Sequence, residues 1–177
     1  MKKITFANIY TLGNIVTETN QYRHVHYPKM LSRYDSNFIA FKDLPSIEDF
    51  EDKEEFLRTF HVSKGQNHVK FCFPESVELP YELNTYLQGK GYDIGFLELY
   101  AIQPSHFPSV TMNSGIDIQA VTEDNLEIFL DLQYLSDVQY GEEFAKQKTD
   151  LLKRQFSEPN IHQVLAFYKG KPAGSVD

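Results

Sequence analysis

The sequence predicts an α+β fold, with mixed sheets of the α/β type, arranged in two lobes. Strand-like segments with alternating apolar residues are separated by segments with helical spacing, which is typical of domains that pack helices on sheets. Of the 177 residues, 41% are hydrophobic and 24% are charged, which is the composition of a globular protein. A stretch rich in Pro and Ser, QPSHFPSVTMNSG, suits neither a helix nor a strand. We therefore expect lobes over 1–103 and 116–177, joined by a linker over 104–115.

The first lobe reads as four or five strands, because YDIGFLELYAI could be one strand or two, together with two helices and one long loop. Strands are expected in KITFANIY, FIAFKD, HVKFCF and YDIGFLELYAI, and a long aromatic loop in NQYRHVHYPKMLSRYDSN. A helix is expected over 46–62, where Ser46 stands at the N-cap position and apolar residues share one face. A shorter helix is expected from Pro80 to the glycines at 89 and 91.

The second lobe reads as strand, helix, helix and a closing hairpin. IDIQAV alternates as a strand, and a helix follows with Thr122 at its N-cap. A second helix over 142–158 stops before Pro159. HQVLAFY and PAGSVD then form two strands around a tight turn, where Gly170 suits a positive φ.

Composition excludes several classes of protein. The net charge of −8 argues against nucleic-acid binding, which needs a surplus of Lys and Arg. No apolar run reaches the length that spans a bilayer, and polar residues interrupt the apolar stretch near the start. The single cysteine, Cys72, fits a buried apolar position in a reducing compartment. We therefore expect a cytoplasmic protein without membrane or nucleic-acid partners.

Two motifs in the second lobe carry a resemblance to a known family. The first comprises Ile116, Ile118, Val121, Thr122 and Asp124, and the second comprises Ala166, Gly170, Pro172 and Gly174. With two helices between them, these motifs resemble the opening half of the GCN5-related N-acetyltransferase (GNAT) superfamily. The resemblance covers 116–177 and implies a GNAT-like fold that transfers an acetyl group from acetyl-CoA to an amine of a small molecule or protein.

The resemblance also implies that an essential part is missing. In that family a later turn of the form [RQ]-x-x-G-x-[GA] binds the acetyl-CoA pyrophosphate at a helix N-terminus, and this motif does not occur in the 177 residues. We therefore expect an inactive fragment of an acetyltransferase, with acetyl-CoA as cosubstrate of the whole protein and poor binding to this chain. The alternative is a non-catalytic binding or dimerisation module on a decayed acetyltransferase fold, with a homodimer formed through an unpaired sheet edge.

The first lobe is similar to the closing half of the same fold, but in degenerate form. In the family a Tyr four residues before a Gly often protonates the leaving thiolate; here Leu87 stands four residues before Gly91, and Tyr86 is displaced by about 100° around the helix. The segment FKDLPSIEDF, at the phosphate-loop position, is acidic and lacks glycine. Because one lobe resembles a second half and the other a first half, a single shared sheet is a further hypothesis.

The resemblance points to the connection LSDVQYGEEF as the acceptor-binding region. Candidate substrate-cleft residues are Tyr134, Asp137, Tyr140 and Glu142, which could orient an amine near a general base. The alternative is an ordinary turn between helices, closed by Gly141. No catalytic, cofactor-binding or metal-ligating residue is assigned.

Three further features have both a functional and a structural interpretation. His24 and His26 would face the same side of a strand as a metal-binding pair, but an aromatic loop is the simpler interpretation. Acidic residues concentrated over 48–55 suggest either a polyamine-binding patch or a solvated helix face. Lys169 and Lys171 flank Gly170 at a hairpin tip, and no helix follows as a phosphate loop requires.

Overall fold

The computed structural model describes residues 4–111 and 113–176. The chain divides into two compact units, Met1–His106 (unit 1) and Phe107–Asp177 (unit 2). This division falls inside the segment predicted as a linker. Both units combine helices with a sheet, and one of the sheets is mixed. The α+β prediction is therefore confirmed.

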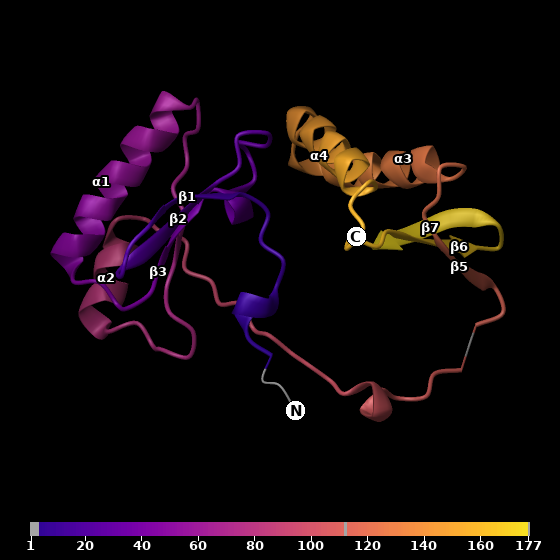
Figure 1. The fold of residues 1–177 in the computed structure, drawn as a ribbon, viewed down its shortest axis with the longest axis horizontal. Coiled ribbons are helices and arrows are strands. Elements are labelled where there is room, and N and C mark those ends of the chain that lie inside the picture. Colours follow the sequence, from indigo (N-terminus) through magenta and orange to yellow (C-terminus); the bar gives the residue numbers. More distant parts are fainter. Residues whose placement is uncertain (1–3, 112, 177) are drawn as a thin grey trace. The chain divides into compact units, whose positions relative to one another are not determined.

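Unit 1 is a mixed four-stranded sheet with two helices (Figure 1). Its elements are β1 (Asn14–Glu18), β2 (Tyr22–His26), β3 (Phe38–Phe41), α1 (Ile47–Ser63), β4 (Phe71–Cys72) and α2 (Tyr81–Gly89), with 3₁₀ turns at Phe6–Asn8 and Tyr34–Ser36. The order is β1-β2-β3-β4. The first three strands are antiparallel, whereas β4 runs parallel to β3, so α1 is the crossover connection between them.

The predicted helix over 46–62 is confirmed, including its cap. The Ser46 hydroxyl accepts a hydrogen bond from the Asp49 backbone N–H at 3.1 Å, which satisfies one of the free donors at the start of α1. Phe50, Leu57 and His61 recur on the buried side of the helix. The second predicted helix is confirmed as α2, and its buried residues are Leu83 and Leu87.

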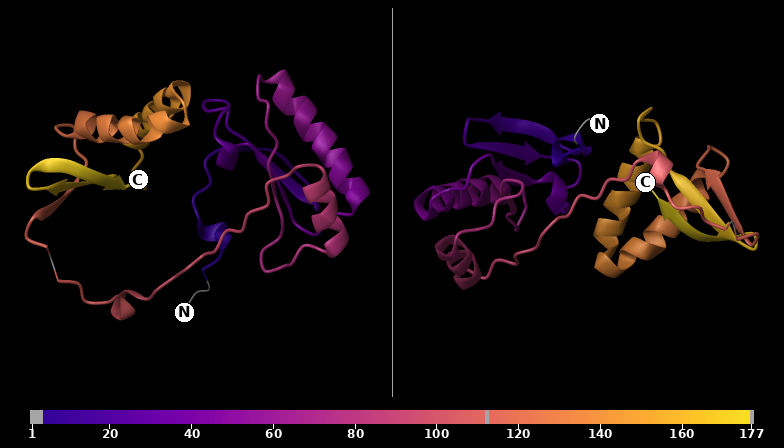
Figure 2. Two further views of the ribbon diagram at one scale, coloured as in Figure 1. Left: turned by 180° about the vertical axis from the view of Figure 1, so that it is seen from behind. Right: turned by 90° about the horizontal axis from the view of Figure 1, so that it is seen from below.

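Both helices of unit 1 pack on the same face of its sheet (Figure 2). Ile39 and Phe41 are two residues apart on β3 and therefore point to one side. They form one cluster of buried residues with the apolar residues of α1 and α2. This cluster is the core of unit 1.

Four segments of unit 1 differ from the prediction, and one of them is Asn14–Glu18, which was not predicted as a strand and forms β1. KITFANIY is not a strand: the Thr5 N–H donates to the Asn8 side chain, and this local bond favours a 3₁₀ turn. Residues 22–26, predicted as loop, form strand β2, whose hairpin is fixed by two hydrogen bonds to the Thr19 hydroxyl. Residues 92–102 form no strand; Phe96 and Tyr100 are more than four-fifths exposed.

Unit 2 is a three-stranded antiparallel sheet with a helix pair on one face (Figure 1). Its elements are β5 (Ile116–Ala120), α3 (Leu126–Asp137), a 3₁₀ turn (Val138–Tyr140), α4 (Glu142–Gln155), β6 (Val164–Tyr168) and β7 (Lys171–Val176). Phe129 and Leu130 of α3, Leu152 of α4 and Leu165 of β6 form its core. At the predicted hairpin, Lys169 and Gly170 both have positive φ (51° and 76°), as a type I′ turn requires.

Two further expectations for unit 2 are wrong. Thr122 is not the N-cap: its N–H donates to the Asn125 side chain, and the helix begins three residues later than predicted. The hypothesis of a single shared sheet is also wrong. In the described residues the strands form two separate sheets, one in each unit.

The face of the unit 2 sheet opposite the helices is open. Leu165 and Phe167 point from β6 into the core beneath α3 and α4. Ile116 and Ile118 pair with Tyr168 and Ala166, so their side chains lie on the other face. Ile118 is 62% exposed and Tyr168 is 47% exposed.

Candidate functional site

The four predicted substrate-cleft residues lie around the junction of α3 and α4. Tyr134 and Asp137 belong to the last turns of α3, Tyr140 to the 3₁₀ turn, and Glu142 to the start of α4. Gly141 joins them with φ 113°, a conformation that residues with a Cβ rarely adopt. The contacts that the structure shows for these residues run to α4.

Asp137 is the buried carboxylate of this group. It is 8% exposed, and its Oδ2 atom is buried without a hydrogen bond while lying 3.7 Å from the Lys148 ammonium. One turn earlier, the Gln133 side chain donates to the Ser175 hydroxyl of β7 at 2.9 Å. The inner side of α3 therefore carries a polar strip beside β7, with a carboxylate oxygen available to accept a proton or bind a cation.

Tyr140 and Glu142 face solvent. Tyr140 is 70% exposed and packs edge to face against Phe144. Glu142 forms an ion pair with Lys146 at 2.8 Å, and the hydrogen bond from this lysine lowers the pKa of Glu142. Glu142 is thus a weak base held by an intrahelical pair. Of the four candidates, Asp137 has the environment that best suits a functional carboxylate.

In unit 1 the start of α1, for which the resemblance implies a phosphate-loop position, is capped by its own side chains. The start of α1 is capped by Ser46, whose hydroxyl also donates to the Asp49 carboxylate at 2.7 Å. Glu48 and Asp49 place negative charge in the first turn. These carboxylates would repel a pyrophosphate at this helix start.

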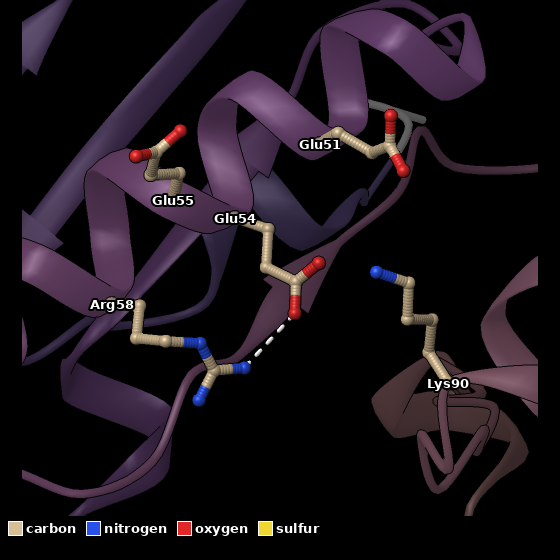
Figure 3. Close-up of a pocket in the computed structure, with 5 residues that line it drawn as sticks. All are labelled: Glu51, Glu54, Glu55, Arg58 and Lys90. Carbon is tan, nitrogen blue, oxygen red and sulfur yellow. Dashed lines mark hydrogen bonds and ion pairs between the residues drawn. The ribbon is translucent and has the colours of Figure 1, made fainter.

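The acidic stretch of α1 is balanced by nearby cations (Figure 3). Glu51, Glu54 and Glu55 line a shallow hollow of about 310 Å³ together with Arg58 and Lys90. Burial acts to raise the pKa of Glu54, but its 2.9 Å pair with Arg58 outweighs this and leaves the pKa lowered. The Tyr86 hydroxyl donates to Glu51 at 2.7 Å. The hollow is therefore an internal ion network between α1 and α2, which favours the structural interpretation over a polyamine site.

A cluster of four histidines, three buried and one half-buried (His68), lies between β2, α1 and the segment after α1, and we call it the imidazole cluster. It consists of His24, His26, His61 and His68. The His61 ring centroid is 6.4 Å from those of His24 and His26 and 5.1 Å from that of His68. The sequence indicated only the pair of His24 and His26. His61 and His68 are distant in the sequence and are brought next to this pair by the α1 crossover.

Neither a metal site nor a reactive thiol accompanies this cluster. Within residues 4–111 and 113–176, no group of three or more His, Cys, Asp or Glu side chains is arranged to hold a metal ion. Burial raises the pKa of the Cys72 thiol, which disfavours the nucleophilic thiolate. Among the described helices, none is both long enough and apolar enough to cross a bilayer.

Comparison with known proteins shows the family but no activity. A search of the curated proteins finds no match. A crystal structure described as that of a functionally unknown conserved protein from Staphylococcus epidermidis ATCC 12228 is 26% identical, with a TM-score of 0.87. The match covers 99% of this chain and 69% of that one. The model of a domain of unknown function, DUF5613, matches residues 4–100, which is more than half of the chain. The chain therefore belongs to the DUF5613 family.

Proposed function

We propose that unit 2 is the opening half of a GNAT-type acetyltransferase domain and that unit 1 is a degenerate relative of the closing half. The observation that carries this proposal is the element order of unit 2. One strand, two helices and an antiparallel hairpin follow one another, and the sheet order is β5-β6-β7. This is the arrangement that the two sequence motifs imply. The cytoplasm, where a lone cysteine stays reduced, is the proposed location.

The proposed reaction is acetyl transfer from acetyl-CoA to a primary amine. The neutral amine attacks the thioester carbonyl, the carbon–sulfur bond breaks, and CoA leaves as a thiolate that takes up a proton. Asp137 would bind the ammonium form of the acceptor and orient it as it loses its proton. Its burial supports this role, and its Oδ2 atom accepts no hydrogen bond, although the Lys148 ammonium lies 3.7 Å away.

Acetyl-CoA binding tests the proposal in two steps. Because the 177 residues lack the pyrophosphate motif, we expect calorimetry to show no micromolar binding of acetyl-CoA to this chain. The protein as purified from its native cell, with its intact mass measured first, is expected to bind acetyl-CoA and to release CoA thiol when amines are added. Micromolar heat with this chain would overturn the expectation of an incomplete site.

Asp137→Asn tests the acceptor role in the native protein. We expect kcat/KM for the amine to fall by about tenfold or more, because the neutral amide cannot pair with an ammonium group. Asp131→Asn is the matched control, since Asp131 is an exposed carboxylate on the same helix. Equal activity in the two variants would contradict a role for Asp137.

The second candidate function is a non-catalytic binding or dimerisation module. It is favoured by the acidic, self-capped start of α1, which the GNAT resemblance would align with a phosphate loop. If the native protein neither binds acetyl-CoA nor releases CoA thiol, this candidate replaces the first. A concentration-dependent mass in solution would then indicate a homodimer through a sheet edge.

A further inference from the structure

The imidazole cluster concentrates most of the histidine of the chain in one buried place. Four of the six histidines belong to it. His24 and His61 are fully buried, and His26 is 7% exposed. His24 and His26 come from β2, and His61 comes from α1. The cluster is therefore part of the contact that holds α1 against β2.

The ring nitrogens of the cluster are poorly satisfied. The structure shows no hydrogen-bond partner for either nitrogen of His24, for Nδ1 of His26, or for Nε2 of His61 and of His68. The His61 Nδ1 atom lies 2.7 Å from the His68 carbonyl oxygen and therefore carries the ring proton. A second proton on His24 would therefore create a buried cation without a hydrogen-bond acceptor.

Aromatic rings cover the cluster from α1. The Phe60 ring meets His24 and His26 edge to face, at centroid distances of 4.7 and 5.0 Å. The Phe56 ring lies 5.6 Å from His24 in the same manner. These rings suit a neutral imidazole. Burial lowers the pKa of His26 and of His61 more than the hydrogen bonds to Asn37 and to the His68 carbonyl raise them.

The charged and titratable groups near the cluster offer few carboxylates that could neutralise a protonated histidine. Lys64, which directly follows α1, acts on His26, and the Tyr34 ring packs on that of His68. Tyr22 on β2, Lys53 on α1, and Asp35 and Lys70 lie on the same or adjoining segments. Asp35 is the carboxylate of this set, and it is already paired with Lys70. The charge of Lys64 lowers the pKa of His26 further. Protonation of the cluster would therefore add positive charge to a site that already faces cations.

We propose that the imidazole cluster is a pH-sensitive contact, and that acidification separates α1 from β2 and opens unit 1. This inference is independent of the proposed acetyltransferase activity, because it concerns the other unit. The opening would expose the apolar side of α1, which carries Phe50 and Leu57.

The direction of the pH dependence follows from linkage. Burial, with the neighbouring His61 charge, lowers the pKa of His24 and of His68 from 6.5 to about 4. The unfolded chain therefore binds protons between these values while the folded chain does not. The contribution of each neutral histidine to the free energy of unfolding is complete above pH 6.5. It decreases as the pH falls and is lost once the pH reaches the pKa of the folded state. For His24 alone, the unfolding equilibrium constant would rise about 30-fold between pH 7.5 and 5.

The test compares His24→Phe with the parent chain. Phe has a similar shape, and His24 makes no hydrogen bond that the change would remove. Hydrogen exchange of α1 amides is measured from pH 8 to 4.5 and corrected for the intrinsic exchange rate. We expect the parent to lose protection as the pH falls, and the increase in opening between pH 7.5 and 5 to be about 30-fold smaller in His24→Phe. His162→Gln, an exposed histidine of unit 2, should behave like the parent.

Two results would overturn the proposal. One is unchanged α1 protection in the parent between pH 8 and pH 4.5. The other is an identical acid response in His24→Phe and the parent. If His24→Phe does not fold at pH 8, the titration of the four imidazole C2 protons in the parent decides: a cluster that titrates near pH 6.5 while α1 stays protected contradicts the mechanism.

Discussion

Phe50→Ala is expected to lower the free energy of unfolding of unit 1 by about 3–5 kcal/mol. Phe50 is fully buried at the centre of the core that β3, α1 and α2 share. Its ring lies within 6.3 Å, centroid to centroid, of five aromatic rings: those of Phe41, Phe71, Phe73, Tyr86 and Tyr92. Removing it leaves a cavity that these rings cannot fill without leaving their own contacts.

Urea unfolding monitored by hydrogen exchange of α1 amides measures this loss. Phe96→Ala is the matched control, because Phe96 belongs to the same unit but is 85% exposed. We expect the control to stay within about 0.5 kcal/mol of the parent. Equal losses in the two variants would mean that the aromatic core does not stabilise unit 1 as the structure implies.

Asn37→Ala is expected to cost about 2–4 kcal/mol, although it removes few contacts with apolar atoms. The side chain is fully buried. Its Oδ1 accepts the Tyr27 N–H at 3.0 Å, and its Nδ2 donates to the carbonyls of Met30 and Arg33 at 3.1 and 2.8 Å. Alanine would leave these three backbone groups without their partner, and that desolvation penalty is the main cost.

Thermal and urea unfolding of Asn37→Ala, with Asn67→Ala as the control, test this expectation. Asn67 is an exposed asparagine of the same unit. Asn37→Asp separates the two halves of the amide: it keeps the acceptor for Tyr27 but points a carboxylate at two carbonyls. We therefore expect it to destabilise as well, and to recover partly at a pH low enough to protonate the carboxyl group. An unaffected Asn37→Ala variant would show that water replaces the amide.

The helices and the second hairpin could be predicted because their patterns are local. The apolar spacing of α1 and its Ser46 cap, and the Gly170 turn between β6 and β7, depend on residues within a few positions of each other. Strand β2 was missed because its buried positions carry His24 and His26, which sequence patterns treat as polar. Only the parallel crossover, which brings His61 beneath them, shows why they are buried.

The sequence proposed four candidate residues but could not show which of them are buried. The motif resemblance indicated the α3–α4 junction, and all four residues lie there. Whether a carboxylate is buried depends on which face of its helix meets the sheet. This face is set by the packing of α3 on β7, which the sequence does not show. Asp137 and Glu142 look equivalent in the sequence, but one is buried beside Lys148 and the other is exposed.

The open face of the β5-β6-β7 sheet has a thermodynamic consequence. Ile116, Ile118 and Tyr168 remain 42%, 62% and 47% exposed when unit 2 folds, so unfolding exposes less apolar surface from this face than from a sheet buried on both sides. The heat-capacity increment per residue should therefore lie below the usual value of about 12–15 cal/mol/K. A small increment flattens the stability curve, so the free energy of unfolding of unit 2 would change little with temperature.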